Sequence, residues 1–283
     1  MKIGICLPNI GKFATAENLM SVAIEADKEG LDSAWVSDHI ATPKHFDAQY
    51  PYSRDGKPPF SETDPILEAL TSLAFVAAKT ERIMLGTSVL VLPLRQSTLV
   101  AKQFGTICAM APNRVIVGVG VGWLEDEFGL LNVDFRNRGS AFDRGLMELV
   151  KLLDPIAAEH DSTVMEPRPS SRPELWIGGG GTARSIERIA SHADAWFAGG
   201  GSPTVILPIL EQIRKSESKY QRKAPVSLTS RIGCKPEKNL VFSRLDTLSN
   251  IGCSHAIIDP VAESLNDFRD QIKYAAQWSS IQT

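Results

Sequence analysis

The sequence predicts an α/β protein built as one (β/α)8 barrel over residues 1–283. Eight apolar runs with strand character each precede a segment whose apolar residues recur at helical spacing. Strands that are apolar along their whole length are typical of parallel sheets, because helices cover both of their faces. The length of 283 residues fits a barrel of typically ~250 residues. A doubly wound open sheet is the alternative, since periodicity does not distinguish open from closed sheets.

Each strand is expected where a short apolar or β-branched run ends in small or polar residues. The predicted starting points are Ile3, Ser33, Ile83, Val115, Glu174, Ala195, Val226 and His255. The third and fourth runs, 83–92 and 115–121, are the clearest. Alternating strands and helices in one chain, without a linker or a break in composition, favour a single domain.

The helices follow from apolar residues repeated every three or four positions, as at Leu19, Val22, Ala23 and Ala26 in the first. The predicted ranges are 16–29, 65–79, 97–111, 140–153, 183–192, 204–220, 240–251 and 265–278. The second is expected to open at Asp64-Pro65, because Asp caps helices and Pro is favoured in the first turn.

Composition excludes several classes of protein. The net charge of −3, with acidic and basic residues interspersed, does not favour nucleic acid or an anionic membrane as a partner. The four cysteines are scattered without a CxxC pair, so neither disulfides nor a metal site is expected. The first residues lack the apolar core of a signal peptide, and no apolar run reaches ~18 residues. A cytoplasmic protein is therefore expected.

Candidate site residues follow the strands, because chemistry in parallel α/β proteins lies where strands end. On that ground the candidates are Thr87, Ser88, Gly120, Gly122 and Asp126. Asp38-His39 follows the second strand, so His39 is a candidate acid or base whose tautomer Asp38 could fix. The acidic run 125–127 is interpreted, on position alone, as a solvated helix start.

Glycine runs suggest where a phosphate and a flat ring could bind. Gly178 to Gly181 stand between a strand and a helix, where backbone N–H groups and the helix dipole favour an anion. A tight turn is the alternative reading. Gly199 and Gly200 could close the other side. The GVGVG segment at 118–122 lacks the GxGxxG spacing of dinucleotide-binding turns and is expected to thin the barrel rim. The loop 50–56 is interpreted as a substrate lid, with an irregular surface loop as the equal alternative.

Several sequence segments together resemble the bacterial luciferase-like superfamily, in its branch that uses the deazaflavin coenzyme F420. The segments are AWVSDHI (34–40), ERIMLGTSVLVLPLR (81–95), AKQFGTI (101–107), NRVIVGVGVGWLEDEF (113–128) and LWIGGGG (175–181). They occur in family order over roughly the first two-thirds of the chain.

The resemblance implies a luciferase-like barrel that binds F420, or alternatively FMN, at the strand C-termini. It implies a cis peptide at Ser88-Val89, a coenzyme-ring contact at Asp38 and an active-site histidine at His39. The positions implied to bind the coenzyme are Asp38, Ser88, Val89, Val91, Val121, Gly122 and Asp126, with Gly179, Gly180 and Gly181 at its phosphate. A homodimer is also implied.

Two departures limit what the resemblance carries over. Sugar-phosphate dehydrogenases of the superfamily have a catalytic glutamate where this chain has Trp123, so their specific chemistry is not transferred. The connection 153–172 is shorter than usual, which affects the substrate mouth.

The sequence thus favours an F420-dependent oxidoreductase that moves a hydride to or from a small organic substrate, with His39 and Asp38 as catalytic residues and no metal. The alternatives are an FMN-dependent monooxygenase using dioxygen, a non-catalytic flavin-binding protein, and a phosphosugar isomerase or aldolase on a generic barrel.

Overall fold

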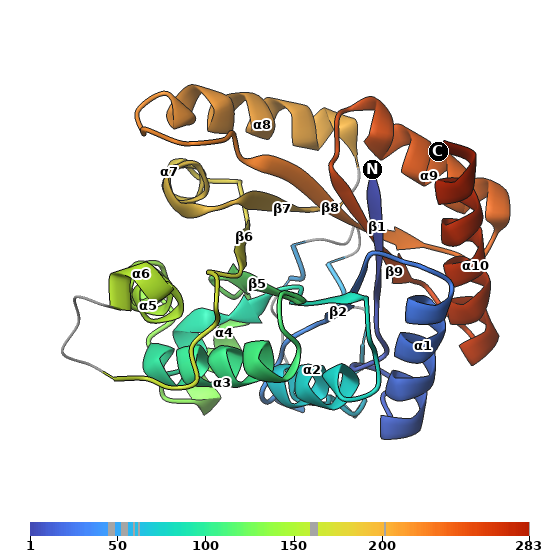
Figure 1. Cartoon of the computed structure of the whole chain (residues 1–283), viewed down its shortest axis with the longest axis horizontal. Coiled ribbons are helices and arrows are strands. Elements are labelled where there is room, and N and C mark those ends of the chain that lie inside the picture. Colours follow the sequence, from blue (N-terminus) through green and yellow to red (C-terminus); the bar gives the residue numbers. More distant parts are fainter. Residues whose placement is uncertain are drawn as a thin grey trace.

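The protein folds into a closed parallel barrel surrounded by helices (Figure 1). The computed structural model describes residues 1–44, 49–51, 56–58, 60–61, 63–158, 164–200 and 202–282. Within these residues the strands are β1 (Lys2–Cys6), β2 (Ser33–Val36), β3 (Met84–Thr87), β4 (Leu90–Val91), β5 (Val115–Gly120), β6 (Glu174–Gly178), β7 (Ala195–Gly199), β8 (Ser227–Cys234) and β9 (His255–Pro260).

Sheet pairing confirms the predicted barrel. Every strand pair is parallel, and the order is β3-β2-β1-β9-β8-β7-β6-β5, with β3 also pairing with β5 to close the ring. The short strand β4 continues the third strand position beyond β3 and pairs with the same neighbour, Leu90 opposite Val119. The barrel therefore has eight strand positions, and the open-sheet alternative is wrong.

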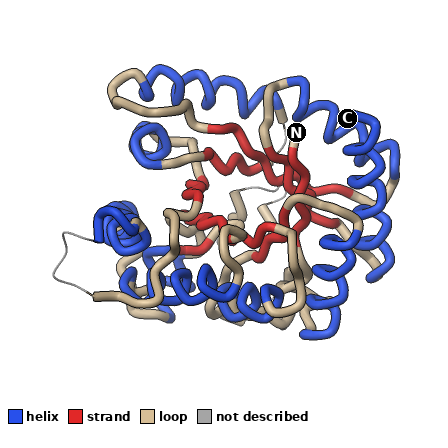
Figure 2. The backbone as a smooth tube through the Cα atoms, viewed as in Figure 1, coloured by secondary structure: helices blue, strands red, loops and turns tan. Residues whose placement is uncertain are grey.

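Helices form a ring outside the strands, which Figure 2 shows as blue coils around red strands. They are α1 (Ala16–Lys28), α2 (Ala69–Ala77), α3 (Ser97–Met110), α4 (Glu125–Leu130), α5 (Arg138–Leu153), α6 (Pro155–Ala158), α7 (Ala183–His192), α8 (Pro203–Glu217), α9 (Lys238–Asn250) and α10 (Leu265–Gln282). Buried apolar stripes on these helices, such as Leu19, Val22, Ala23 and Ala26 of α1, pack against the strands.

The third predicted strand, 83–92, divides into two short strands, β3 and β4. It breaks between β3 and β4 at the peptide bond between Ser88 and Val89, which is cis, as the resemblance implied. After Val91 the chain turns into a 3-10 helix, η1 (Leu92–Leu94), with a proline in its first turn. The run of apolar residues hid this change, because all three residues of η1 are buried.

Helix α2 begins later than predicted. Residue Glu68 is its N-cap and accepts a hydrogen bond from the backbone of Thr71, so the helix starts at Ala69 and not at Pro65. The residues before it instead pair with the loop after β1: Ile66 bridges Ile10, and the Leu67 amide donates to the Asn9 carbonyl. A contact distant in sequence therefore outweighs the local helix-start signal.

The barrel interior is filled by aromatic side chains. Trp35 and Trp176 lie 4.7 Å apart between ring centroids, and Phe197 packs at the edge of Trp35, 5.5 Å away. A Cβ at Gly86 would come within 2.3 Å of the Trp35 ring, so β3 has no side chain where the indole needs room. This layer closes the barrel beneath the strand C-termini, and any site must lie above it.

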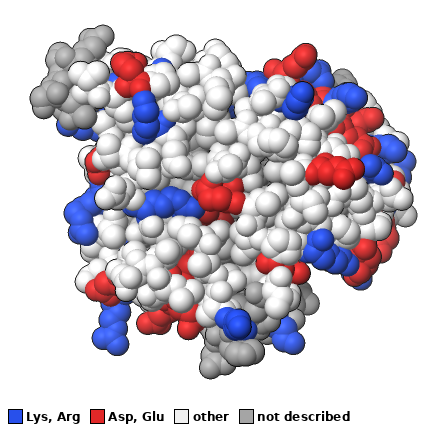
Figure 3. Space-filling view, turned by 90° about the horizontal axis from the view of Figure 1, so that it is seen from below, with Lys and Arg blue, Asp and Glu red and all other residues white. Residues whose placement is uncertain are grey.

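The face of the protein shown in Figure 3 has no large patch of a single charge sign. Lys and Arg side chains alternate with Asp and Glu there, and uncharged residues occupy most of the area between them. Among the described residues, no helix combines the length and the apolar character needed to cross a bilayer. The same part of the chain brings together no group of three or more His, Cys, Asp or Glu side chains that could hold a metal.

Candidate active site

A cavity of about 210 Å³ opens at the C-terminal ends of the strands. Six of the residues singled out from the sequence line it: Asp38, His39, Ser88, Val89, Val91 and Val121. Four glycines singled out from the sequence, Gly120, Gly122, Gly178 and Gly179, also line it. The strand-end rule therefore located the cavity correctly.

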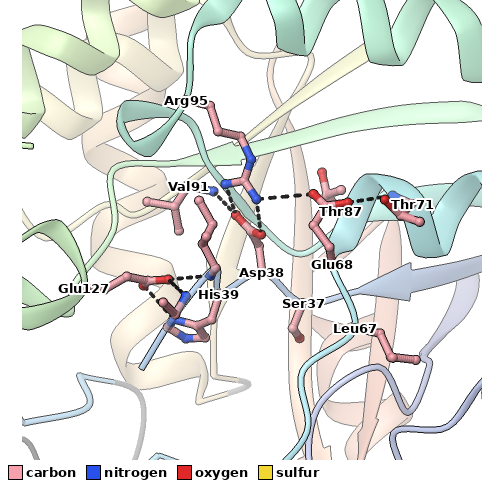
Figure 4. A network of polar contacts seen from close by, with 12 residues as sticks. Ser37, Asp38, His39, Leu67, Glu68, Thr71, Thr87, Val91, Arg95 and Glu127 are labelled. Carbon is pink, nitrogen blue, oxygen red and sulfur yellow. Dashed lines mark hydrogen bonds and ion pairs between the residues drawn. The ribbon is translucent and has the colours of Figure 1, made fainter. Parts of the chain in front are cut away.

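His39 is held by a glutamate that lies two strand positions further along the barrel rim (Figure 4). Its Nδ1 lies 2.8 Å from Oε2 of Glu127, and both side chains are buried. The other oxygen of Glu127 accepts hydrogen bonds from the backbone amides of Ile40, at 2.6 Å, and Ala41, at 3.3 Å. The carboxylate therefore fixes both the His39 ring and the loop that follows β2.

Asp38 does not orient His39, which corrects the expectation from the sequence. Its carboxylate forms a two-pronged ion pair with Arg95, at 2.7 and 2.8 Å, and accepts the Val91 amide at 2.8 Å. Figure 4 shows Asp38 turned toward Arg95 while His39 faces Glu127. Burial raises the pKa of Asp38, and Arg95 and the Val91 amide oppose that rise. Asp38 thus ties the loop after β2 to β4, through Val91, and to the segment after β4, through Arg95.

Within the acidic run, the structure places a different residue at the site from the one expected. Asp126 is exposed and is not among the residues lining the cavity, whereas Glu127 is only 1% exposed. The interpretation of the run as a solvated helix start is wrong for Glu127. The signal was helical phase: Glu127 lies three residues after buried Leu124 and beside buried Phe128, so it shares the inward face of α4.

Arg231, which the sequence reading missed, lies at the cavity on the β8 side. Its guanidinium pairs with Asp259 of β9 at 2.9 Å, and its Nη1 donates to the Ser88 carbonyl at 2.8 Å and to the Ser37 hydroxyl at 3.0 Å. Because β8 lies across the barrel from β3, this side chain joins the two halves of the mouth. Burial raises the pKa of the neighbouring Cys6 thiol to about 12. That thiol therefore carries no charge at neutral pH.

The glycine run after β6 leads from the cavity to the start of α7. Gly179 and Gly180 have φ of 121° and 131°, a conformation that L side chains rarely adopt. Gly180 is buried, and a Cβ there would come within 2.9 Å of Ile209 and 3.1 Å of Trp196. Gly181 is exposed with open space around its Cβ position, next to Thr182, which caps α7. Gly199 and Gly200 are exposed as well.

Two further candidates have different outcomes. Thr87 is not a cavity residue: its hydroxyl donates to the Gly118 carbonyl at 2.6 Å and ties β3 to β5. The proposed lid at 50–56 lies mostly outside the described residues, because only Tyr50, Pro51 and Gly56 of it are described. Tyr50 lines the cavity together with Phe60.

Comparison with solved structures shows the same fold. The monooxygenase RslO1 from Streptomyces bottropensis superimposes with a TM-score of 0.76 at 16% identity, covering 100% of this chain and 99% of that one. An F420-dependent secondary alcohol dehydrogenase, in complex with an F420-acetone adduct, gives a TM-score of 0.73 at 14% identity over 97% of both chains.

Sequence comparison finds nearer relatives. An uncharacterized protein from Mycobacterium tuberculosis is 31% identical over 215 residues, which span 73% of this chain and 74% of that one. An F420-dependent glucose-6-phosphate dehydrogenase from Kineococcus radiotolerans is 33% identical over 190 residues, covering 61% of this chain and 51% of that one. The family model for luciferase-like monooxygenases matches residues 1–238. The chain therefore belongs to the luciferase-like monooxygenase family, and it is an oxidoreductase.

Proposed function

We propose that the protein is a coenzyme F420-dependent oxidoreductase that transfers a hydride to or from a small organic substrate. The observation that carries the proposal is the buried His39–Glu127 pair at the cavity, which gives the site a positioned acid or base. Relatives at 30% identity or more that are named F420-dependent glucose-6-phosphate dehydrogenases support the choice of F420 over FMN.

The residues around the cavity fit a flat ring with an attached phosphate. Gly120, Gly122 and Gly178 have no side chains at the rim, so a ring can approach the backbone beside Val89. Gly179 leads to the N-terminus of the ten-residue helix α7, where backbone N–H groups and the helix dipole favour an anion. When bound, the deazaflavin would supply the acceptance or donation of a hydride.

The chain's own residues would handle the proton and the positioning. A carboxylate only accepts hydrogen bonds, so Glu127 holds the proton of His39 on Nδ1 and leaves Nε2 as the exchanging atom. In the oxidative direction, Nε2 would take the hydroxyl proton of the substrate, and the carbon that bears the hydroxyl would lose its hydride to the coenzyme. The alcohol thereby becomes a carbonyl product. In the reductive direction, the same nitrogen returns the proton to the carbonyl oxygen.

The proposal is tested by titrating the purified protein separately with F420 and with FMN, following intrinsic Trp fluorescence. Tighter binding of F420 by tenfold or more is expected. Tighter binding of FMN would favour the monooxygenase alternative, and binding of neither would refute both.

A variant then tests the catalytic role of His39. We expect His39→Ala to bind F420 nearly as the unmodified protein does, yet to lose about 10²–10⁴-fold in turnover, the usual scale for a positioned acid or base. If His39 only packed the cavity wall, His39→Ala would instead melt at a lower temperature while turnover per folded molecule stayed the same. If F420 binds but neither the unmodified protein nor His39→Ala turns over substrate, the non-catalytic alternative is favoured.

A further inference from the structure

The cavity has an aromatic compartment around His39. The Phe60 ring lies 5.1 Å from the imidazole between centroids, and the Trp123 ring lies 5.9 Å away in an edge-on arrangement. Tyr50 packs against Trp123 at 5.1 Å. All three rings line the cavity and are half-buried, so part of each faces the space beside the candidate proton-transfer group.

The charges that line this cavity are already matched. Asp38 is paired with Arg95, and Asp259 is paired with Arg231. Among the described lining residues, Arg231 is the one side chain with a permanent positive charge. Its Nε and Nη2 lie against Asp259, and its Nη1 donates to Ser88 and Ser37.

This balance disfavours a strongly charged substrate. A phosphate group carries up to two negative charges and is held by several cationic or N–H donors. Contacts among the described residues already engage four of the five N–H groups of Arg231, and Asp259 neutralises its charge. Aromatic side chains, in contrast, offer a large apolar contact area, and an uncharged ligand that packs against them leaves the existing ion pairs intact.

We propose that the substrate is an uncharged, largely apolar alcohol, aldehyde or ketone that binds between Phe60, Tyr50 and Trp123 with its oxygen toward His39. The inference rests on the proposed function and separates this chain from the sugar-phosphate substrate in its relatives' names. Trp123 is central to it, because this ring contacts both His39 and Tyr50.

Isothermal titration calorimetry of the full chain with two probes tests the substrate class. Acetophenone represents an uncharged aromatic ketone, and glucose 6-phosphate represents a sugar phosphate. We expect acetophenone to bind at least tenfold more tightly than glucose 6-phosphate. Equal or tighter binding of glucose 6-phosphate would overturn the proposal.

Variants of the aromatic compartment localise the binding. Trp123→Ala is expected to weaken acetophenone binding about tenfold, and the matched Trp123→Phe variant is expected to stay within threefold of the unmodified protein. Phe60→Leu provides an independent result if Trp123→Ala lowers the melting temperature. Unchanged acetophenone affinity in folded Trp123→Ala or Phe60→Leu would contradict the assignment.

F420 titrations of the same samples keep the two proposals apart. Loss of acetophenone binding with F420 affinity kept within threefold places the probe at the substrate compartment. If the unmodified protein binds neither F420 nor FMN, the proposed function fails, while the ranking of the two probes still decides the substrate class.

Discussion

Nδ1 of His39 and Oε2 of Glu127 lie 2.8 Å apart, although 88 residues separate them in the chain. His39 follows β2, and Glu127 lies on α4, after β5. A single strand position, that of β3 and β4, separates β2 from β5 in the barrel, so the two side chains meet at the rim. The remaining oxygen of Glu127 accepts two backbone amides, so the carboxylate has no freedom to turn away from the imidazole. Because one carboxylate holds both the backbone of the rim and the His39 ring, the structure of the rim determines which ring nitrogen of His39 faces the carboxylate.

Replacing Glu127 by Gln should disable proton transfer without removing the cofactor site. The one amide oxygen of Gln would satisfy the Ile40 and Ala41 amides, and its NH₂ would face Nδ1 and impose the opposite tautomer. A loss of about 10²–10⁴-fold in kcat is expected, the scale of a positioned acid or base. The pH dependence of kcat should also change, which a purely structural role would not cause.

Asp126→Asn is the matched control, because Asp126 is the exposed neighbour of Glu127 on the same helix. It is expected to keep turnover within twofold. A large loss in Asp126→Asn together with normal turnover in Glu127→Gln would restore the original assignment of Asp126 to the site.

Removing Arg95 should destabilise the protein strongly. Arg95→Met leaves the fully buried Asp38 carboxylate without its partner, and breaking a buried pair this way costs about 3–5 kcal/mol in the free energy of unfolding. Burial already raises the pKa of Asp38, so the variant should lose less stability at acidic pH, where the carboxyl is protonated, than at neutral pH.

Urea unfolding at pH 7 and pH 5 measures both effects. The double variant Arg95→Met/Asp38→Asn is expected to recover much of the lost free energy, because no unpaired charge remains buried. Single and double variants that unfold at the same urea concentration would show that the ion pair adds little.

Most of the barrel could be predicted from the sequence because its strands are locally encoded. Each predicted strand starts within one residue of the observed one, since apolar runs ending in small or polar residues are sufficient signals. The start of α2 could not be read this way, because the Ile10–Ile66 bridge, which draws the chain before it into an extended form, joins residues 56 positions apart.

The candidate site was predicted in position but not in its pairings. Strand ends identified His39, Ser88 and Gly120 as cavity residues, but they do not show which charged group meets which. Arg231 reaches Ser37 across 194 residues, and the Glu127 contact spans 88. Adjacency in the sequence predicts that Asp38 meets His39, whereas in the folded chain successive side chains of the loop face different partners.

His255 should make the stability of the protein fall in acid. It is buried beneath the cavity against Ser33, 2.7 Å away, and burial lowers its pKa to about 3. An unfolded histidine has a pKa of about 6.5, so between these values the unfolded chain binds more protons than the folded one. The contribution is complete above pH 6.5 and is lost as pH falls, by up to about 1.4 kcal/mol per pH unit.

Urea unfolding of the unmodified protein and His255→Gln from pH 7 to pH 4 tests this linkage. The stability advantage of the unmodified protein over the variant is expected to shrink as the pH falls. Free energies of unfolding that fall in parallel for both proteins would show that His255 is not the group responsible.

Gly181→Ala separates a phosphate site from a simple turn. A Cβ at Gly181 meets no atom within 4 Å, and the residue is exposed at the start of α7, so the substitution should leave the melting temperature within about 2 °C. If the glycine run holds the phosphate of the cofactor, the added methyl group occupies the space that the anion needs, and F420 affinity should fall about tenfold. Gly180→Val is the contrasting variant, because its Cβ would meet Trp196 and Ile209 at a positive φ and should lower stability as well as affinity. The decisive measurement is the pair of F420 affinity and melting temperature on Gly181→Ala: unchanged affinity with an unchanged melting temperature would mean that the glycines only make the turn from β6 into α7, and the phosphate would have to bind elsewhere on the rim.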